Sequence, residues 1–165
     1  MHTHSPARGA TPGSDRHTAR MISTAHATTL LELGLEWSPE PGDRFRIRGQ
    51  GFESDVFTIS ELTIEAHEHA TGTVLGFNGT TEWALDSVAL EDSLWLPRED
   101  QLRALLAGAF RSLRREIGGA EDGAHVVLVV IDGHEIEHRD LEAEEAYAKA
   151  LIAVMEAAAP TSPAA

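Results

Sequence analysis

An unbroken apolar run, Val126-Val127-Leu128-Val129-Val130-Ile131, places the strongest constraint on the fold of this chain. A short run of this kind, rich in β-branched residues, is typical of a strand that is buried on both faces. Asp132 and Gly133 follow at once, and Asp-Gly is a strong signal for a two-residue hairpin turn. We therefore predict a hairpin whose returning strand is 134–138.

Three of the four predicted helices follow from caps and apolar spacing. The first runs from about Thr24 to Leu33, with Gly34 as a left-handed C-terminal cap. The second begins at Pro97 and continues to Ile117, because apolar residues recur there at helical spacing. The third is capped by Asp140 and buries the side that carries Tyr147, Ala150, Leu151, Val154 and Met155.

Alternating apolar residues between the first two helices predict an antiparallel meander. The alternating pairs are Phe45 with Ile47, Phe57 with Ile59, Leu62 with Ile64, and Leu75 with Phe77. Thr80 or Thr81 is then expected to cap a short helix that ends near Ser87. The predicted class is α+β, with an antiparallel sheet, made of the meander and the hairpin, covered by helices.

The length of 165 residues suits one domain. Residues 1–20 lack apolar periodicity and residues 159–165 are rich in alanine and proline, so both ends are predicted to be disordered tails. A single domain is expected over residues 21–158, and Met21 is a candidate start of the protein.

Composition excludes several classes of function. The net charge of −14 argues against nucleic-acid binding, which needs a positive field. The chain has no cysteine, so disulfides, thiolate metal sites and cysteine nucleophiles are absent. No segment offers the roughly 18 consecutive apolar residues of a membrane span, and residues 1–20 offer no apolar signal-peptide core. A cytoplasmic protein that contacts neither membrane nor nucleic acid is expected.

His134-Glu135-Ile136-Glu137-His138 matches the zinc-protease pattern H-E-x-x-H. That pattern binds zinc on a helix, where the two histidines stand one turn apart. After an Asp-Gly turn we expect a strand instead, on which residues four apart are separated by about 13 Å. One zinc ion with bonds to nitrogen near 2 Å cannot join them. His67 and His69, two residues apart beside a predicted turn, form a second histidine pair, and no metal is predicted at either.

The binding residues that we predict lie in and after the segment 78–86. Asn78 and Thr80 stand at the start of the short predicted helix, where backbone N–H groups can bind an anion. Tryptophan is enriched at interaction sites, and Trp37, Trp83 and Trp95 are the chain's 3 tryptophans. The predicted binding surface consists of Asn78, Thr80, Thr81, Trp83, Asp86 and Trp95.

Four motifs point to a family. They are Gly42-Asp43-Arg44-Phe45, Asp55-Val56-Phe57-Thr58-Ile59-Ser60, the segment 76–88 (GFNGTTEWALDSV) and Trp95-Leu96-Pro97-Arg98-Glu99-Asp100-Gln101-Leu102. Over roughly residues 28–115 the chain resembles a group of small uncharacterised proteins of high-GC Gram-positive bacteria, often labelled as CpaE-type pilus-assembly proteins. The resemblance implies no catalytic residue. An ATPase of that label would need a phosphate loop and its lysine, which this chain lacks.

From the sequence we expect a non-catalytic binding or regulatory module, without cofactor, that acts on a protein partner of unknown identity. Two alternatives stay open. One is a zinc-dependent hydrolase that uses His134, Glu135 and His138, and the other is a small-ligand sensor with tryptophans in its pocket. The oligomeric state is not predicted.

Overall fold

A computed structural model describes residues 21–49, 52, 55–60, 63–77, 87–118 and 122–159. The helices of this part of the chain are α1 (Thr24–Glu32), α2 (Glu99–Leu106) and α3 (Ala143–Ala158). Single 3₁₀ turns occur at Leu90–Asp92 and Ala107–Ala109. Among the described residues, no helix is long and apolar enough to cross a membrane.

The described strands form three antiparallel sheets of three strands each, ordered β2-β1-β6, β3-β4-β5 and β7-β8-β9. This mixture of helices and antiparallel sheets confirms the α+β class, although the strands expected in one meander are divided between the first two sheets. The bounds of the described strands are β1 (Arg44–Ile47), β2 (Phe57–Thr58), β3 (Ile64–His69), β4 (Gly72–Phe77), β5 (Ser87–Ala89), β6 (Ser93–Trp95), β7 (Phe110–Arg115), β8 (His125–Ile131) and β9 (His134–Asp140).

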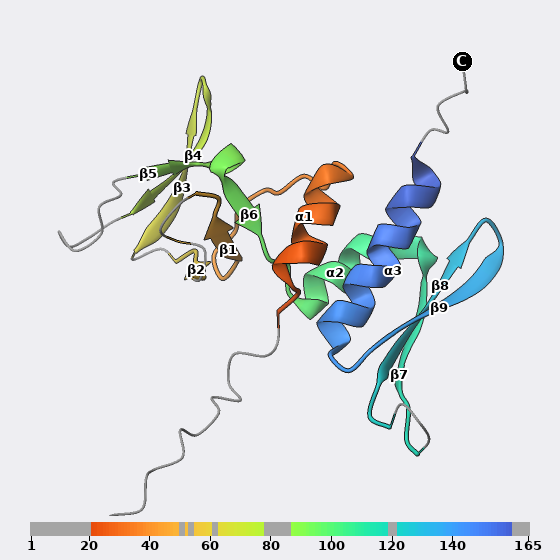
Figure 1. Ribbon diagram of the computed structural model, residues 1–165. Coiled ribbons are helices and arrows are strands. Elements are labelled where there is room, and N and C mark those ends of the chain that lie inside the picture. Colours follow the sequence, from red (N-terminus) through yellow and green to blue (C-terminus); the bar gives the residue numbers. More distant parts are fainter. Residues whose placement is uncertain are drawn as a thin grey trace, which may run out of the picture.

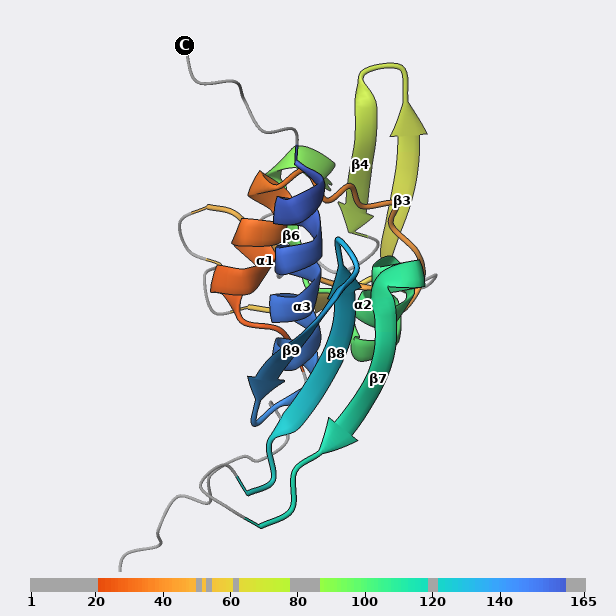
Figure 2. The ribbon, with the colours of Figure 1, turned by 90° about the vertical axis from the view of Figure 1, so that its right-hand side faces the viewer.

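The three helices lie between the strands β1–β6 and the sheet β7-β8-β9 (Figure 1). Seen from the side of that sheet, α3 lies directly behind β8 and β9 (Figure 2). Most of the buried apolar side chains of the described residues form two clusters. The helical core joins α1, α2, α3, β6 and β8, and the strand core joins β1 to β5.

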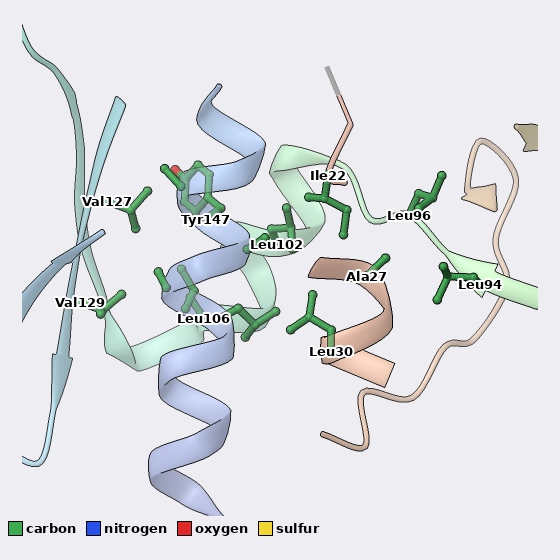
Figure 3. Close-up of a cluster of buried hydrophobic side chains, with 14 residues drawn as sticks. Ile22, Ala27, Leu30, Leu94, Leu96, Leu102, Leu106, Val127, Val129 and Tyr147 are labelled. Atoms are coloured by element: carbon green, nitrogen blue, oxygen red, sulfur yellow. The ribbon is translucent and has the colours of Figure 1, made fainter. Parts of the chain in front are cut away.

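The helical core is centred on α3. Tyr147 is 1% exposed and stacks on Phe110 with the ring centroids 5.8 Å apart. Figure 3 shows Val127 and Val129 pointing from β8 toward α3, with Leu102 and Leu106 of α2 beside it. Alanines at 146, 148 and 150 are fully buried. Their small side chains let neighbouring elements approach α3 on several sides.

The strand core is built from alternating residues of short strands. Phe45 is fully buried and stacks on Phe57, and Phe77 packs against the same Phe57 ring in a T-shaped arrangement. Leu94 and Leu96 leave this part of the molecule and enter the helical core instead. Strand β6 therefore connects the two cores.

The first predicted helix is confirmed. Helix α1 begins after Ser23, whose hydroxyl accepts a hydrogen bond from His26 N at 3.2 Å, and Gly34 follows its end with φ of +89°. The Glu145 carboxylate of α3 receives hydrogen bonds from Ser23 N and His26 Nδ1. This contact ties the start of α1 to the first turn of α3.

The second predicted helix is wrong beyond Leu106. Helix α2 ends there, Ala107 has φ of +45°, and the chain continues as β7. A β-bulge between Phe110 and Ser112 explains the error. It places Phe110 opposite Val129 and Leu113 opposite Val127, so two residues three apart share one face of a strand. That spacing imitates a helix. Ile117, the last residue of the predicted apolar face, is 90% exposed.

The C-terminal hairpin and helix follow the prediction, with one correction at Asp140. Strands β8 and β9 pair in register from Ile131 with His134 to His125 with Asp140. The cap residue of α3 is Glu142, not Asp140. The Asp140 carboxylate accepts a hydrogen bond from Glu142 N at 3.1 Å and receives Lys149 Nζ at 2.8 Å. Asp140 thus fixes the turn into the helix without being its cap.

Two arginines cover the outer face of the β7-β8-β9 sheet. Arg114 and Arg139 are the neighbours of Val126 on either side, and Val126 is fully buried. Arg114 contacts Glu116 and Glu137, each at 3.0 Å. The helix predicted from Pro97 to Ile117 would carry Arg114 in its last turns. It lies instead on the sheet, where its aliphatic stem covers a valine.

Candidate functional site

A cavity of about 720 Å³ lies between α1 and the strands β4, β5 and β6. Its walls come from α1, from the segment 34–38 that leaves this helix, from the turn between β3 and β4, and from residues 89–97. The large apolar side chains that line it are Leu30, Leu31, Leu35, Trp37, Leu90, Leu94 and Trp95. We call it the tryptophan cavity.

Two tryptophans from separate segments stack at this cavity. Trp37 follows α1, Trp95 ends β6, and their rings are 6.1 Å apart between centroids and only 5° from parallel. Trp37 also packs on Phe45, with the centroids 5.7 Å apart, and Phe45 pairs with Trp95 in the β1–β6 register. The pair therefore connects the cavity wall to the strand core.

The two indole nitrogens differ in their partners. Trp37 Nε1 donates a hydrogen bond to the Asp43 carboxylate at 2.9 Å. Trp95 Nε1 is buried and has no hydrogen-bond partner among the described residues. An unpaired buried N–H costs about 1–3 kcal/mol. The Trp95 ring therefore occupies its position at a cost that other contacts offset.

Asp43 holds one wall of the site in place. Its side chain is 1% exposed, and besides Trp37 it accepts hydrogen bonds from Glu40 N at 3.0 Å, Arg98 Nη1 at 3.0 Å and Gln101 Nε2 at 2.6 Å. A buried carboxylate is tolerated when it is paired and hydrogen-bonded in this way. The network joins the start of β1 to the start of α2.

The central place of Asp43 was not predicted, although a signal for it is present in the sequence. Asp43 belongs to the motif 42–45, and Arg98 and Gln101 belong to the motif 95–102. The structure brings these two motifs together through the Asp43 network. Their shared role is therefore the positioning of Trp37 and of α2.

Trp95 is the predicted binding residue whose place the structure gives, and it lines the tryptophan cavity. Asn78, Thr80, Thr81, Trp83 and Asp86 lie outside the described residues, as does the short helix predicted for this segment. At the boundary of that segment, Ser87 begins strand β5.

The H-E-x-x-H match lies on strand β9, as expected from the Asp-Gly turn. His134 is opposite Ile131 and His138 is opposite Val127, so the two histidines are four residues apart on extended backbone. Glu135 points to the other face of the sheet. The helical arrangement of a zinc protease is thus contradicted at these residues. Within the described residues, no group of three His, Asp or Glu side chains could hold a metal ion.

The environments of His138 and His67 differ. His138 Nε2 is buried without a hydrogen-bond partner among the described residues, and burial lowers the pKa of this histidine, as does the nearby Lys149 charge. His67 on β3 is half exposed and approaches Glu65 at 3.8 Å. Its ring lies over Gly76, where an added Cβ atom would stand 2.9 Å from His67 Cδ2. This contact gives His67 a packing role.

The described part of the chain is an α+β fold with two hydrophobic cores and a tryptophan-lined cavity beside the strand that connects them. Comparison with protein-family models, with curated proteins and with solved structures finds no match to this chain.

Proposed function

We propose that this chain is a non-catalytic binding module whose ligand is a small, largely apolar molecule held in the tryptophan cavity. The observation that carries the proposal is a cavity of about 720 Å³ with two stacked tryptophans in its wall. Sites for small molecules typically measure roughly 300–1,000 Å³ and are mostly apolar with a few polar groups. Ser38, Thr73 and Ser93 supply hydroxyls here.

The charge of the lining supports a neutral or cationic ligand. Glu36 and Glu91 are the charged residues among the described lining, which includes no Lys, Arg or His. An anion would meet these carboxylates without a compensating positive group. The tryptophan faces attract cations as well as flat apolar groups.

A regulatory role would follow from where the ligand binds. The lining includes Leu30 and Leu94 of the helical core together with Trp37 and Leu90, which pack on the strand core. A ligand that contacts lining residues of both cores stabilises one arrangement of the helical core relative to the strand core. The proposed module would report the presence of its ligand through this stabilisation.

A screen of apolar metabolites by thermal melting and tryptophan fluorescence tests the proposal. A ligand that binds only the folded state should raise the melting temperature and change the emission of Trp37 and Trp95. Absence of any shift across neutral and cationic apolar compounds would count against it.

A matched pair of leucines locates the binding site. Leu31 lines the cavity and is 38% exposed, whereas Leu105 on α2 is 37% exposed and does not line it. Leu31→Asp should weaken binding at least about tenfold, because it places a charge in an apolar wall. Leu105→Asp should leave binding unchanged. Equal effects of the two substitutions would place the ligand elsewhere.

The sequence-based expectation of a protein partner can be tested with the same variants. Here the partner would insert an apolar side chain into the tryptophan cavity in place of a metabolite. Capture of one specific protein that Leu31→Asp abolishes and Leu105→Asp preserves would favour the partner over the small ligand.

A further inference from the structure

Among the described strands, β9 lies at the edge of its sheet and pairs along its whole length with β8 alone. Figure 2 shows it at one border of the β7-β8-β9 sheet, with α3 behind. Four consecutive residues, 134–137, are exposed. The backbone of β9 therefore has a second edge that can accept another strand.

The turn fixes which backbone groups face that edge. Asp132 and Gly133 both have positive φ, of 52° and 81°, as a two-residue type I′ hairpin requires. In such a hairpin the residues flanking the turn, Ile131 and His134, form a hydrogen-bonded pair, and bonded pairs then alternate. Even-numbered residues of β9 bond to β8, and Glu135, Glu137 and Arg139 direct N–H and C=O outward. Lys149 Nζ already donates to the Arg139 carbonyl at 2.9 Å, which agrees with an outward carbonyl there and leaves its second lone pair for another strand.

The sequence of β9 is complementary to itself about Glu137. When two β9 strands run antiparallel with Glu137 on a two-fold axis, Glu135 of each copy faces Arg139 of the other. His134 likewise faces Asp140. This register also places the three outward-facing residues of one strand opposite those of the other, as backbone pairing requires.

We propose that a second copy of this chain pairs with β9 in this register and extends the sheet to six strands. Each dimer contains two Glu135–Arg139 pairs across the interface, and opposite charges on facing residues stabilise a strand pair. The interface also covers Ile136, an exposed apolar residue of the hairpin at 38%. The two Glu137 side chains face each other, and each is already paired with Arg114 at 3.0 Å and with Arg139.

Charge reversal and remixing test both the dimer and its register. Glu135→Arg and Arg139→Glu each replace two attractive pairs by two repulsive ones. The dimer affinity of each variant alone should therefore be weaker by at least about tenfold. An equimolar mixture of the two variants restores opposite charges at each of these pairs in the heterodimer. The mixture should therefore recover the mass of the wild-type dimer. Mass is measured by sedimentation velocity over a concentration series.

Two controls separate the interface from the fold. Glu68→Arg makes the same charge change on β3, another edge strand, and should leave the dimer intact. Glu137→Pro removes one outward N–H that β8 does not use. Circular dichroism of this variant should therefore show a folded chain, and sedimentation velocity should show a monomer. A wild-type chain that is monomeric up to its solubility limit would overturn the proposal. So would dimers that survive both single reversals, or a mixture that stays monomeric.

A strand from a different protein is the other possible occupant of this edge. Sedimentation of the purified chain distinguishes the two, because pairing with another protein leaves the purified chain monomeric. The test is independent of the tryptophan cavity, since no residue of β9 lines it.

Discussion

The buried carboxylate of Asp43 contacts the guanidinium of Arg98 at 3.0 Å across 55 positions of sequence. Arg98 also donates to the Gly42 carbonyl at 2.9 Å and reaches Asp100 at 3.2 Å. Because Arg98 stands at the start of α2 and Asp43 precedes β1, this pair sets the position of the helices relative to the strands. The wall of the tryptophan cavity depends on it through Trp37.

Removal of the buried partner of Arg98 should be far more damaging than removal of the exposed one. Asp43→Ala leaves several donors without an acceptor, and loss of one member of a buried ion pair costs about 3–5 kcal/mol. Asp100, whose side chain is 72% exposed, also contacts Arg98, but Asp100→Asn should cost less than about 1 kcal/mol. Urea denaturation measures both free energies of unfolding. Similar losses would mean that Asp43 does not carry the network.

The two stacked tryptophans should respond differently to loss of the indole nitrogen. Trp37→Phe removes a hydrogen bond to a buried carboxylate and should cost about 1.5–3 kcal/mol. Trp95→Phe removes a buried N–H that has no partner among the described residues, so relief of this penalty offsets the lost apolar contact. We expect its free energy of unfolding to stay within about 1 kcal/mol of wild type. A larger loss for Trp95→Phe than for Trp37→Phe would contradict the structure.

His138 should make stability fall at acid pH. Burial lowers the pKa of this histidine below 6.5, and the Lys149 charge adds to the effect. The unfolded chain therefore binds more protons, so the contribution of neutral His138 is fully present above pH 6.5. It is lost as the pH falls from there to the folded-state pKa. Asp140, which binds Lys149, titrates at lower pH because its own pKa is also lowered. Burial raises this pKa, but the hydrogen bonds from Lys149 and from the backbone lower it by more.

The measurement is denaturation of wild type and His138→Gln over a pH series. The free energy of unfolding of the variant should increase relative to that of wild type as the pH falls below 6.5, because glutamine does not titrate. A difference that is constant with pH would show that His138 has its ordinary pKa in the folded protein.

Gly76 and His67 should be energetically coupled. Gly76→Ala brings a Cβ atom to 2.9 Å from His67 Cδ2, so the imidazole ring has to move. In a His67→Ala background the space is open, and the alanine should stabilise the protein by about 0.4–1 kcal/mol through the unfolded chain. A double-mutant cycle should give a coupling of at least about 0.5 kcal/mol. An additive pair would show that the ring moves without cost.

Elements with strong local signals could be predicted from the sequence. Gly34 takes the positive φ expected of a C-terminal cap, and Asp132-Gly133 forms the expected turn. Helix α3 buries Tyr147, Ala150 and Leu151 as its apolar spacing predicts. In each case the information lies within a few residues of the element itself.

Strand β7 could not be predicted because its local pattern fits two structures. Phe110 and Leu113 are three apart, which indicates one face of a helix unless a bulge is known to lie between them. The bulge becomes visible only when β8 is present as the pairing partner. Competition between helix and strand is therefore decided here by tertiary contacts, not by propensity.

The candidate site was only partly predictable for a related reason. Tryptophans are conspicuous in a sequence, so Trp37 and Trp95 could be considered at once as ligand-contacting residues. Their stacking and the hydrogen bond to Asp43 depend on chain segments that are far apart. Spacing within one sequence carries no information about such meetings.

Strand β6 has a consequence for how the molecule opens. Its backbone is hydrogen-bonded to β1, while Leu94 and neighbouring Leu96 are buried among the helices. Local unfolding of either the strand core or the helical core would therefore disrupt contacts of β6. Amide hydrogens of β6 should accordingly be among the last to exchange with heavy water, and their exchange rates should report the cooperativity of the whole chain.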